Sequence, residues 1–454
     1  MKIRYFLLCL IITFIGILYF NKSMESMWVE QKNINQNALI NMINESNNKQ
    51  YYKDTISNNN ASEIKELPLK SKAACVYDCN GKRELYSKNS TEKLPMASTT
   101  KIMTCIIALE NADINEMCEI SAYAASMPDV QLNAKKGEKF VLKDLLYSLM
   151  LESHNDVAVA IAEHIGNSSK SQEVDLNNYE ESKKNVARFA KMMNDKTKEL
   201  GLKDTNFVTP NGLDADNHYT TAHDLAIIAS YAIKNKSFLN ITNAKSYTFN
   251  SDKGRSYTVN NKNQFLNSYS GAIGCKTGYT SKAGYCFVGA IDKNNSNGDY
   301  KLVSVVLGCG WPPHKTYKWQ DTKKLMDYAV NNYSNKKIVI DNSIFNGKKV
   351  IVEKGYDEST DVECSFIKPN IDKKYNILLK ENEDISYEIK LNKKVIAPIK
   401  KGQIIGYIKV YINNNEYNTI YIKAQNNIEK VTFVKKFTEL LHFFTRGYVD
   451  IKNN

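Results

Sequence analysis

Three short motifs in a fixed order limit the folds open to this chain: Ser98-Thr99-Thr100-Lys101, Ser153-His154-Asn155 and Lys276-Thr277-Gly278. Each motif alone is equally well explained as a helix start, a polar turn between helices or a solvated edge strand. The second motif begins 55 residues after the first, and the third begins 123 residues after the second, so they belong to different elements. Their joint presence predicts a fold that brings all three into one reactive cleft.

The first motif has the residues needed for nucleophilic catalysis. A serine hydroxyl is a poor nucleophile near neutral pH and needs a base within reach. Residues three apart on a helix share a face, so Lys101 is expected beside Ser98. Lysine can act as a base when burial or a second cation lowers its pKa, and Lys276 is the candidate cation. The helix start would also favour negative charge developing at Ser98.

The other two motifs are expected to bind substrate. Ser153 and Asn155 can both project into a cleft if they lie in a turn between two helices. On a strand, Lys276 and Gly278 point to one side and Thr277 to the other. Glycine permits a peptide to approach as an added strand, and Lys276 with Thr277 suits a carboxylate group.

Hydrophobic periodicity predicts an α+β domain over residues 67–335. An N-terminal hairpin should come first, because an Asn-Gly turn separates two apolar runs. Helices and then an antiparallel set of strands should follow. The expected helices cover residues 98–110, 142–149, 157–165, 186–193 and 222–233, and the expected strands cover residues 273–280, 285–291 and 302–307.

The remaining C-terminal residues change character twice. Short β-branched runs separated by turn residues predict a small all-β sandwich domain over residues 336–428. Residues 429–450 carry apolar side chains at spacings of three and four, with cations off that stripe, which predicts an amphipathic helix associated with a membrane surface. The alternative is a helix docked on the β domain.

The N-terminus indicates export. Lys2 and Arg4 precede an uncharged apolar run, so residues 1–27 are expected to be a signal peptide or signal-anchor. Residues 28–66 are polar without apolar periodicity and are expected to form a flexible tether. We therefore expect the protein to be exported and to lie at the extracytoplasmic face of the cell membrane. Whether the segment is cleaved stays open.

Charge and cysteine content restrict the partners. The net charge of +12 favours an anionic setting such as a membrane or cell-wall polymer. No basic run is interleaved with base-stacking aromatics, so no nucleic-acid partner is expected. The nine cysteines are scattered and lack metal-ligand spacing, so we expect buried free thiols, no metal and no cofactor.

In their order and type, the three motifs resemble the signature of penicillin-binding proteins and serine β-lactamases. The chain resembles most closely the low-molecular-mass D-alanyl-D-alanine carboxypeptidases, also in residues 205–213, 218–224 and 395–402. The resemblance implies a β-lactamase/transpeptidase-like catalytic domain. It also implies removal of the terminal D-alanine from peptidoglycan stem pentapeptides through an acyl-serine intermediate, with β-lactams as covalent inhibitors.

The resemblance also implies roles for the motif residues. Ser98 would be the nucleophile, and Ser153 would relay a proton between Lys101 and the leaving amine. Asn155 would orient the substrate amide. The backbone N–H groups of Ser98 and Tyr279 would form the oxyanion hole.

One departure from the family pattern and two alternative functions stay open. His154 is an inviting general base, but the family does not rely on a histidine there. Lys318 stands where these enzymes often carry arginine, which binds carboxylates differently. A serine β-lactamase is the enzymatic alternative, although residues 211–216 offer no convincing equivalent of the glutamate that class A members use. A non-catalytic penicillin-binding sensor or scaffold is the other alternative.

Overall fold

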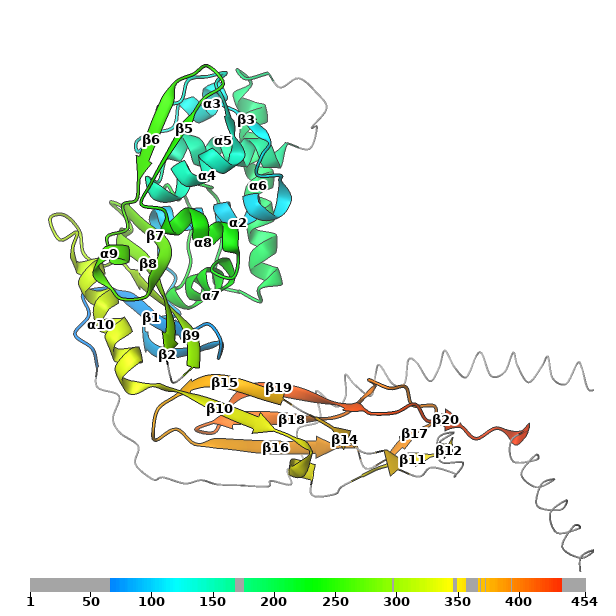
Figure 1. Cartoon of the computed structure of the whole chain (residues 1–454). Coiled ribbons are helices and arrows are strands. Elements are labelled where there is room, and N and C mark those ends of the chain that lie inside the picture. Colours follow the sequence, from blue (N-terminus) through cyan, green and yellow to red (C-terminus); the bar gives the residue numbers. More distant parts are fainter. Residues whose placement is uncertain are drawn as a thin grey trace, which may run out of the picture. The chain divides into compact units, whose positions relative to one another are not determined.

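The computed structural model describes residues 66–167, 175–295, 298–345, 349–356, 366–367, 369–371, 373–392 and 394–434 (Figure 1). The predicted signal segment, nearly all of the tether and most of the predicted C-terminal helix lie outside these residues. The chain divides into two compact units, which are described separately below. One contains Ile385–Lys393 and Ile404–Ile422, and the other contains the catalytic motifs.

A five-stranded antiparallel sheet forms the centre of the domain that carries the motifs. Its strand order is β2-β1-β9-β8-β7, so the predicted N-terminal hairpin and C-terminal strands join in one sheet, with β7 at an edge. The strands are β1 (Ala73–Asp78), β2 (Arg83–Lys88), β7 (Ala272–Thr280), β8 (Gly284–Asn295) and β9 (Gly298–Leu307).

The helices lie where the apolar periodicity predicted them. They are α2 (Lys101–Asn111), α4 (Leu142–Leu151), α5 (Asn155–Gly166), α6 (Tyr179–Glu199) and α7 (Ala222–Ala232), with α3 (Ala122–Ala125), α8 (Lys236–Asn243), α9 (Phe265–Ser268) and α10 (Tyr317–Asn332) in addition. A 3-10 turn, η1 (Ala97–Thr100), leads directly into α2. Two hairpins complete the domain: β3 (Met117–Glu119) with β4 (Lys139–Val141), and β5 (Ser246–Asn250) with β6 (Ser256–Asn260).

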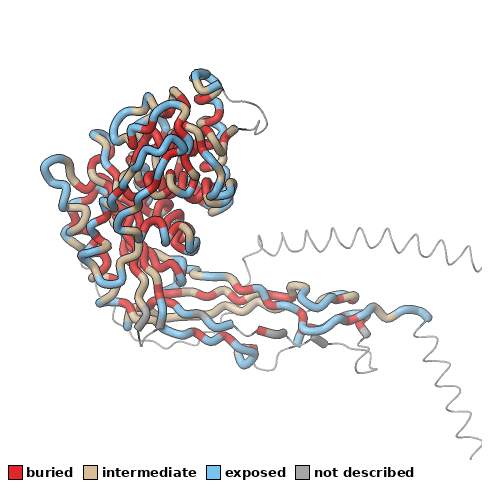
Figure 2. The backbone as a smooth tube through the Cα atoms, turned by 45° about the horizontal axis from the view of Figure 1, so that its top comes forward, coloured by how far each residue is buried: buried red, intermediate tan, exposed pale blue. Residues whose placement is uncertain are grey.

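Apolar side chains from the two faces of the sheet enter two different clusters. Cys75 and Val305 belong to the cluster that contains most of the helices, including α2, α4 and α5. Their neighbours Val76 and Val306 belong to the cluster that contains Leu325 of α10. Because successive strand residues point to opposite faces, the sheet is the middle layer between the main helices and α10 (Figure 1). Figure 2 shows that buried residues are concentrated in the interior of this domain.

The C-terminal residues form small sheets, which confirms the predicted all-β character. Asn413 and Asn414 have φ of +48° and +66°, as a two-residue type I′ turn between β18 and β19 requires. The strands are β10 (Ser334–Ile340), β11 (Val350–Glu353), β12 (Gly355–Tyr356), β13 (Phe366–Ile367), β14 (Pro369–Asn370), β15 (Lys373–Leu379), β16 (Ile385–Leu391), β17 (Lys394–Ile396), β18 (Ile404–Ile412), β19 (Asn415–Ala424) and β20 (Glu429–Lys430).

The predicted C-terminal helix does not begin at residue 429. Glu429 and Lys430 instead form β20, which pairs with β12 in an antiparallel ladder, so strand pairing overrides the helical periodicity there. Residues 435–450 of the predicted helix lie outside the described residues. Of the helices that the structure describes, none combines the length and apolar character needed to cross a membrane.

Candidate active site

Ser98 lies in η1, wedged between two glycine-containing segments. A Cβ added to Gly278 of β7 would lie 3.0 Å from Ser98 N, and one added to Gly212 would lie 2.0 Å from Ala97 O. Ala97 itself has φ of +50°, a left-handed conformation that is uncommon outside glycine. The peptide before the nucleophile is therefore strained and tightly enclosed on two sides.

Lys101 is fully buried and has three partners at its amine. Its Nζ lies 2.9 Å from Ser98 Oγ, 2.8 Å from Asn155 Oδ1 and 2.5 Å from Asn211 O. The two carbonyl-type oxygens can only accept hydrogen bonds. A neutral amine can therefore donate its two protons to Asn155 and Asn211, which leaves its lone pair to accept the Ser98 proton when the serine attacks.

The surroundings favour the neutral form of Lys101. Burial and repulsion from Lys276 lower the pKa of Lys101 well below its ordinary value, while the Asp156 carboxylate acts in the opposite direction. Burial, with a smaller contribution from Lys318, lowers the pKa of Lys276 to about 7. The pair of buried lysines therefore makes a base available near neutral pH.

Ser153 occupies the predicted turn between α4 and α5. Its φ is +75°, and its buried Oγ has no hydrogen-bond partner among the residues that the structure describes. Buried hydroxyl groups are normally paired, so this one is available to a bound molecule. Its role as a proton relay stays a prediction.

The ring of the neighbouring His154 contacts Ser148 and Glu152. Nδ1 lies 2.7 Å from Ser148 Oγ, and Nε2 lies 3.5 Å from Glu152 Oε2. Burial lowers the pKa of this histidine. These contacts agree with the expectation that His154 is not the general base.

Asn155 joins the base to the loop that precedes α4. Its Oδ1 accepts from Lys101, and its Nδ2 donates to Pro128 O at 3.1 Å and Asp129 O at 3.0 Å. Its backbone N–H donates to Val130 O at 2.7 Å. The predicted contact with the substrate amide stays a prediction; Oδ1 accepts from Lys101 and has a second lone pair with which it could accept from a substrate N–H.

Asp156 also binds the loop at residues 128–132, and it was not identified from the sequence. It is buried, and its Oδ1 accepts from Leu132 N at 3.0 Å and from Val157 N at 2.9 Å. It directly follows the second motif, which was the one available signal. The start of α5 thus holds residues 128–132 beside the base.

The third motif alternates along β7 as a strand should. Lys276 and Gly278 are buried, Thr277 is half-buried, and Tyr279 is exposed and packs against Tyr285 with ring centroids 4.7 Å apart. Lys276 Nζ donates to Thr277 O at 3.0 Å. The close approach of Gly278 to Ser98 N sets the nucleophile beside this edge strand.

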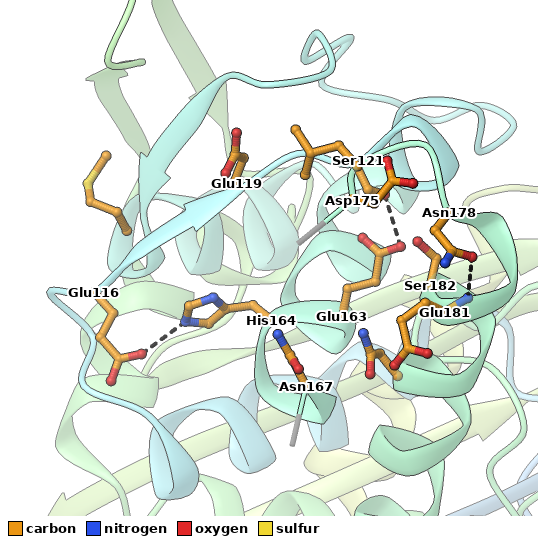
Figure 3. A pocket seen from close by; sticks show the side chains of 13 residues that line it. Glu116, Glu119, Ser121, Glu163, His164, Asn167, Asp175, Asn178, Glu181 and Ser182 are labelled. Carbon is orange, nitrogen blue, oxygen red and sulfur yellow. Dashed lines mark hydrogen bonds and ion pairs between the residues drawn. The ribbon is translucent and has the colours of Figure 1, made fainter. Parts of the chain in front are cut away.

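A separate cavity of about 270 Å³ lies among α5, α6 and the β3 segment (Figure 3). Glu116 pairs with His164 at 2.9 Å, and Glu163 accepts from Ser121 at 2.9 Å on its wall. No motif residue lines it, and its carboxylates would repel an anionic ligand. Within the described residues, no group of three or more His, Cys, Asp or Glu side chains could hold a metal ion.

Comparison with known proteins identifies the family. The family model described as D-alanyl-D-alanine carboxypeptidase, peptidase S11, matches residues 58–310. A second model, the C-terminal domain of penicillin-binding protein 5, matches residues 329–430. The chain belongs to the D-alanyl-D-alanine carboxypeptidase family and is a serine peptidase, a hydrolase.

Individual relatives agree with this assignment. The D-alanyl-D-alanine carboxypeptidase DacF of Bacillus subtilis is 30% identical over 382 residues, which cover 82% of this chain and 90% of the relative. The crystal structure of penicillin-binding protein 5 from Haemophilus influenzae matches with a TM-score of 0.63 at 25% identity, covering 81% of this chain and all of that one. The Streptomyces K15 DD-transpeptidase matches with a TM-score of 0.51 at 29% identity, covering 58% and 98%. These matches confirm the predicted fold class.

Substitution of Gly212 tests the packing behind the nucleophile. Gly201 and Gly212 have φ of +75° and +83°, so alanine at either should cost about 1–2 kcal/mol of strain. Gly201 has open space around its Cβ position, whereas Gly212→Ala would also displace Ala97 O. We expect Gly212→Ala to be the more destabilising in urea unfolding and to slow acylation by penicillin, with Gly201→Ala as the control. Equal effects of the two variants on unfolding and acylation would contradict the proposed packing.

Asp156→Asn tests the electrostatic control of the base. Because Asp156 raises the pKa of Lys101, removing its charge should lower that pKa further. The acid limb of acylation, where Lys101 loses its proton, should move to lower pH. The measurement is the acylation rate constant as a function of pH, with Glu119→Gln as a control at a distant carboxylate that pairs with Lys139. If the acid limb of the pH profile moves to higher pH, the assigned effect of Asp156 on the pKa of Lys101 is wrong.

Proposed function

We propose that this enzyme removes the terminal D-alanine from peptidoglycan stem pentapeptides through an acyl-Ser98 intermediate, and that penicillin acylates the same serine. One observation carries the proposal. The buried amine of Lys101 lies 2.9 Å from Ser98 Oγ and contacts two oxygens that can only accept hydrogen bonds, so in its neutral form it can take the Ser98 proton. The printed names of the relatives, which are carboxypeptidases and penicillin-binding proteins, support the choice of substrate and inhibitor.

Acylation begins with attack of Ser98 Oγ on the carbonyl carbon of the penultimate D-alanine. Lys101 takes the hydroxyl proton as the Oγ–C bond forms. The negative oxygen of the tetrahedral intermediate lies beside the backbone N–H groups of Ser98 and Tyr279, each worth about 3–4 kcal/mol in such sites. The C–N bond then breaks, and the proton passes from Lys101 through the Ser153 hydroxyl to the leaving amine.

Deacylation restores the enzyme. Water attacks the ester carbonyl of acyl-Ser98, and its proton goes to the neutral base as the second tetrahedral intermediate forms. Collapse of that intermediate breaks the Oγ–C bond and returns one proton to Ser98. The products of the cycle are D-alanine and a peptide shortened by one residue.

Substrate recognition is proposed to use the edge of the sheet. A peptide can add to β7 as a strand because Gly278 leaves room beside Ser98. Its terminal carboxylate would lie near Lys276 and Thr277, and Lys318 adds positive charge to the same region. Binding of an anion would raise the pKa of Lys276 and keep it charged.

Substitution of Ser98 tests the reaction. We expect labelled penicillin to form one covalent adduct on the peptide that contains Ser98, and Ser98→Ala to abolish both the adduct and D-alanine release from a D-Ala-D-Ala peptide. Ser126→Ala is the matched control, because that exposed serine bonds only locally to Tyr123 O. Mass spectrometry measures the adduct and the products.

The outcome also separates the alternatives. Release of many equivalents of D-alanine excludes a non-catalytic sensor. Rapid turnover of penicillin without peptide hydrolysis would favour a serine β-lactamase. An adduct that survives Ser98→Ala would contradict the assignment of the nucleophile.

We further propose that the enzyme is exported and works at the extracytoplasmic membrane surface. The apolar segment behind Lys2 and Arg4 supports export. The cations and apolar stripe of residues 430–449 support interfacial binding, at about 1 kcal/mol per lysine or arginine on anionic lipid. Phe433 and Val434, at the start of that stripe, are 79% and 72% exposed.

Vesicle co-sedimentation tests the membrane proposal. The chain without residues 1–27 should bind anionic vesicles, and binding should weaken with added salt because the attraction is partly ionic. The same chain also lacking residues 430–454 should stay in the supernatant. If both forms stay in solution, the C-terminal stripe is not a membrane-binding element.

A further inference from the structure

His218 is a buried histidine that no step of the proposed mechanism uses. It lies between the glycine-containing segment at Gly212 and the start of α7. Its two ring nitrogens contact two different parts of the chain. Nδ1 lies 2.9 Å from Val208 N, and Nε2 lies 2.9 Å from Thr100 Oγ1 of η1. The ring therefore bridges the nucleophile turn and the segment that contains Asn211.

The hydrogen-bond partners of His218 are compatible with only one tautomer of its ring. The backbone N–H of Val208 can only donate, so Nδ1 must accept. The Thr100 hydroxyl gives its one proton to Ala97 O at 2.8 Å, so Nε2 must carry the ring proton and donate to Thr100. Two independent contacts thus specify the same neutral tautomer. Burial, which lowers the pKa of His218 to about 4, agrees with it.

One end of this bridge reaches the nucleophile. The chain of donors runs from His218 to the Thr100 hydroxyl and then to the carbonyl of Ala97, the residue before Ser98. Ala97 is in the left-handed conformation, which persists only when surrounding contacts hold it. The hydrogen bond at Ala97 O is such a contact.

The Val208 end of this bridge leads to Asn211, whose carbonyl oxygen accepts a hydrogen bond from Lys101. Val208 is three residues before Asn211, whose carbonyl accepts from Lys101 Nζ at 2.5 Å and from Ser98 Oγ at 3.3 Å. Thr104 of α2 donates to Pro210 O at 2.6 Å and holds the same segment from a second side. A shift of this segment would move the Asn211 carbonyl away from Lys101.

We propose that His218 is a positioning residue for acylation, coupling η1 to the segment Phe207–Leu213 so that Lys101 Nζ stays within reach of Ser98 Oγ. It acts through Thr100, Ala97 and Asn211 and touches no reacting atom. The inference rests on the proposed function, because it assigns His218 to the acylation step of that reaction.

The test measures acylation of the full chain by penicillin, separating the noncovalent dissociation constant from the acylation rate constant. His218→Ala and Thr100→Val should each lower the rate constant about 10-fold or more, because small misplacements of reacting groups are costly. The dissociation constant should change less than about twofold, because β7 is untouched. Thr100→Ser keeps the hydroxyl and should retain most of the rate.

A double variant tests the coupling itself. If His218 acts through Thr100, the His218→Ala/Thr100→Val variant should be no slower than the slower single variant. His223→Ala is the control: this histidine of α7 pairs with Glu84 at 2.9 Å, away from the site, and the variant should acylate at the normal rate. Thr100→Val replaces a buried hydroxyl with a methyl group of the same shape. It therefore tests the same coupling if the His218→Ala variant does not fold.

The results distinguish the two proposals. Multiplicative losses in the double variant would overturn the positioning role, as would folded single variants that acylate at the normal rate. So would a loss in Thr100→Ser as large as that in Thr100→Val. In all of these cases the proposed function stands. A wild-type chain that neither reacts with penicillin nor releases D-alanine would overturn the proposed function itself.

Discussion

The arrangement of the site depends on one buried amine. Lys101 has no exposed surface and lies among Ser98, Asn155 and Asn211, which come from η1, α5 and the segment before α7. Burying an ammonium ion away from water is costly, so burial and the neighbouring Lys276 favour the neutral form. A neutral amine that donates both protons to Asn155 and Asn211 keeps its lone pair free, and Ser98 Oγ lies 2.9 Å from it.

Holding three segments around one amine requires close packing of backbone against backbone. Gly212 and Gly278 lack a Cβ where one would collide with Ala97 or crowd Ser98 N, so the strand β7 and the segment at Gly212 can both reach η1. The contacts of Asn155 and Asp156 with residues 128–132 close a third side. Packing of helices on both faces of the sheet fixes the positions of these segments.

The local parts of the fold were predictable and some features of the site were not. Apolar residues at spacings of three and four predicted α4, α5, α6 and α7, because burial of one helix face requires that spacing. The predicted start of the C-terminal helix at residue 429 was wrong, because Glu429 and Lys430 pair with β12. The hydrogen bond from Lys101 to the Asn211 carbonyl could not be predicted, because a main-chain carbonyl has no sequence signature. His154 was an inviting base from its position, although the family resemblance argued against it, and its contacts with Ser148 and Glu152 show that its ring is occupied.

The sequence by itself determined the chemistry that is possible: a serine, two lysines, a second serine and an amide at spacings that match one family. Those residue types determine which groups can donate, accept or attack, whatever their surroundings. Only the tertiary structure decided which of them act on one another. The depressed pKa of Lys276, the hydrogen bonds of the Lys101 amine and the single tautomer of His218 all depend on burial and on partners far away in the chain. Desolvation and hydrogen-bond direction exist only after folding, because water satisfies every one of these groups in the unfolded chain.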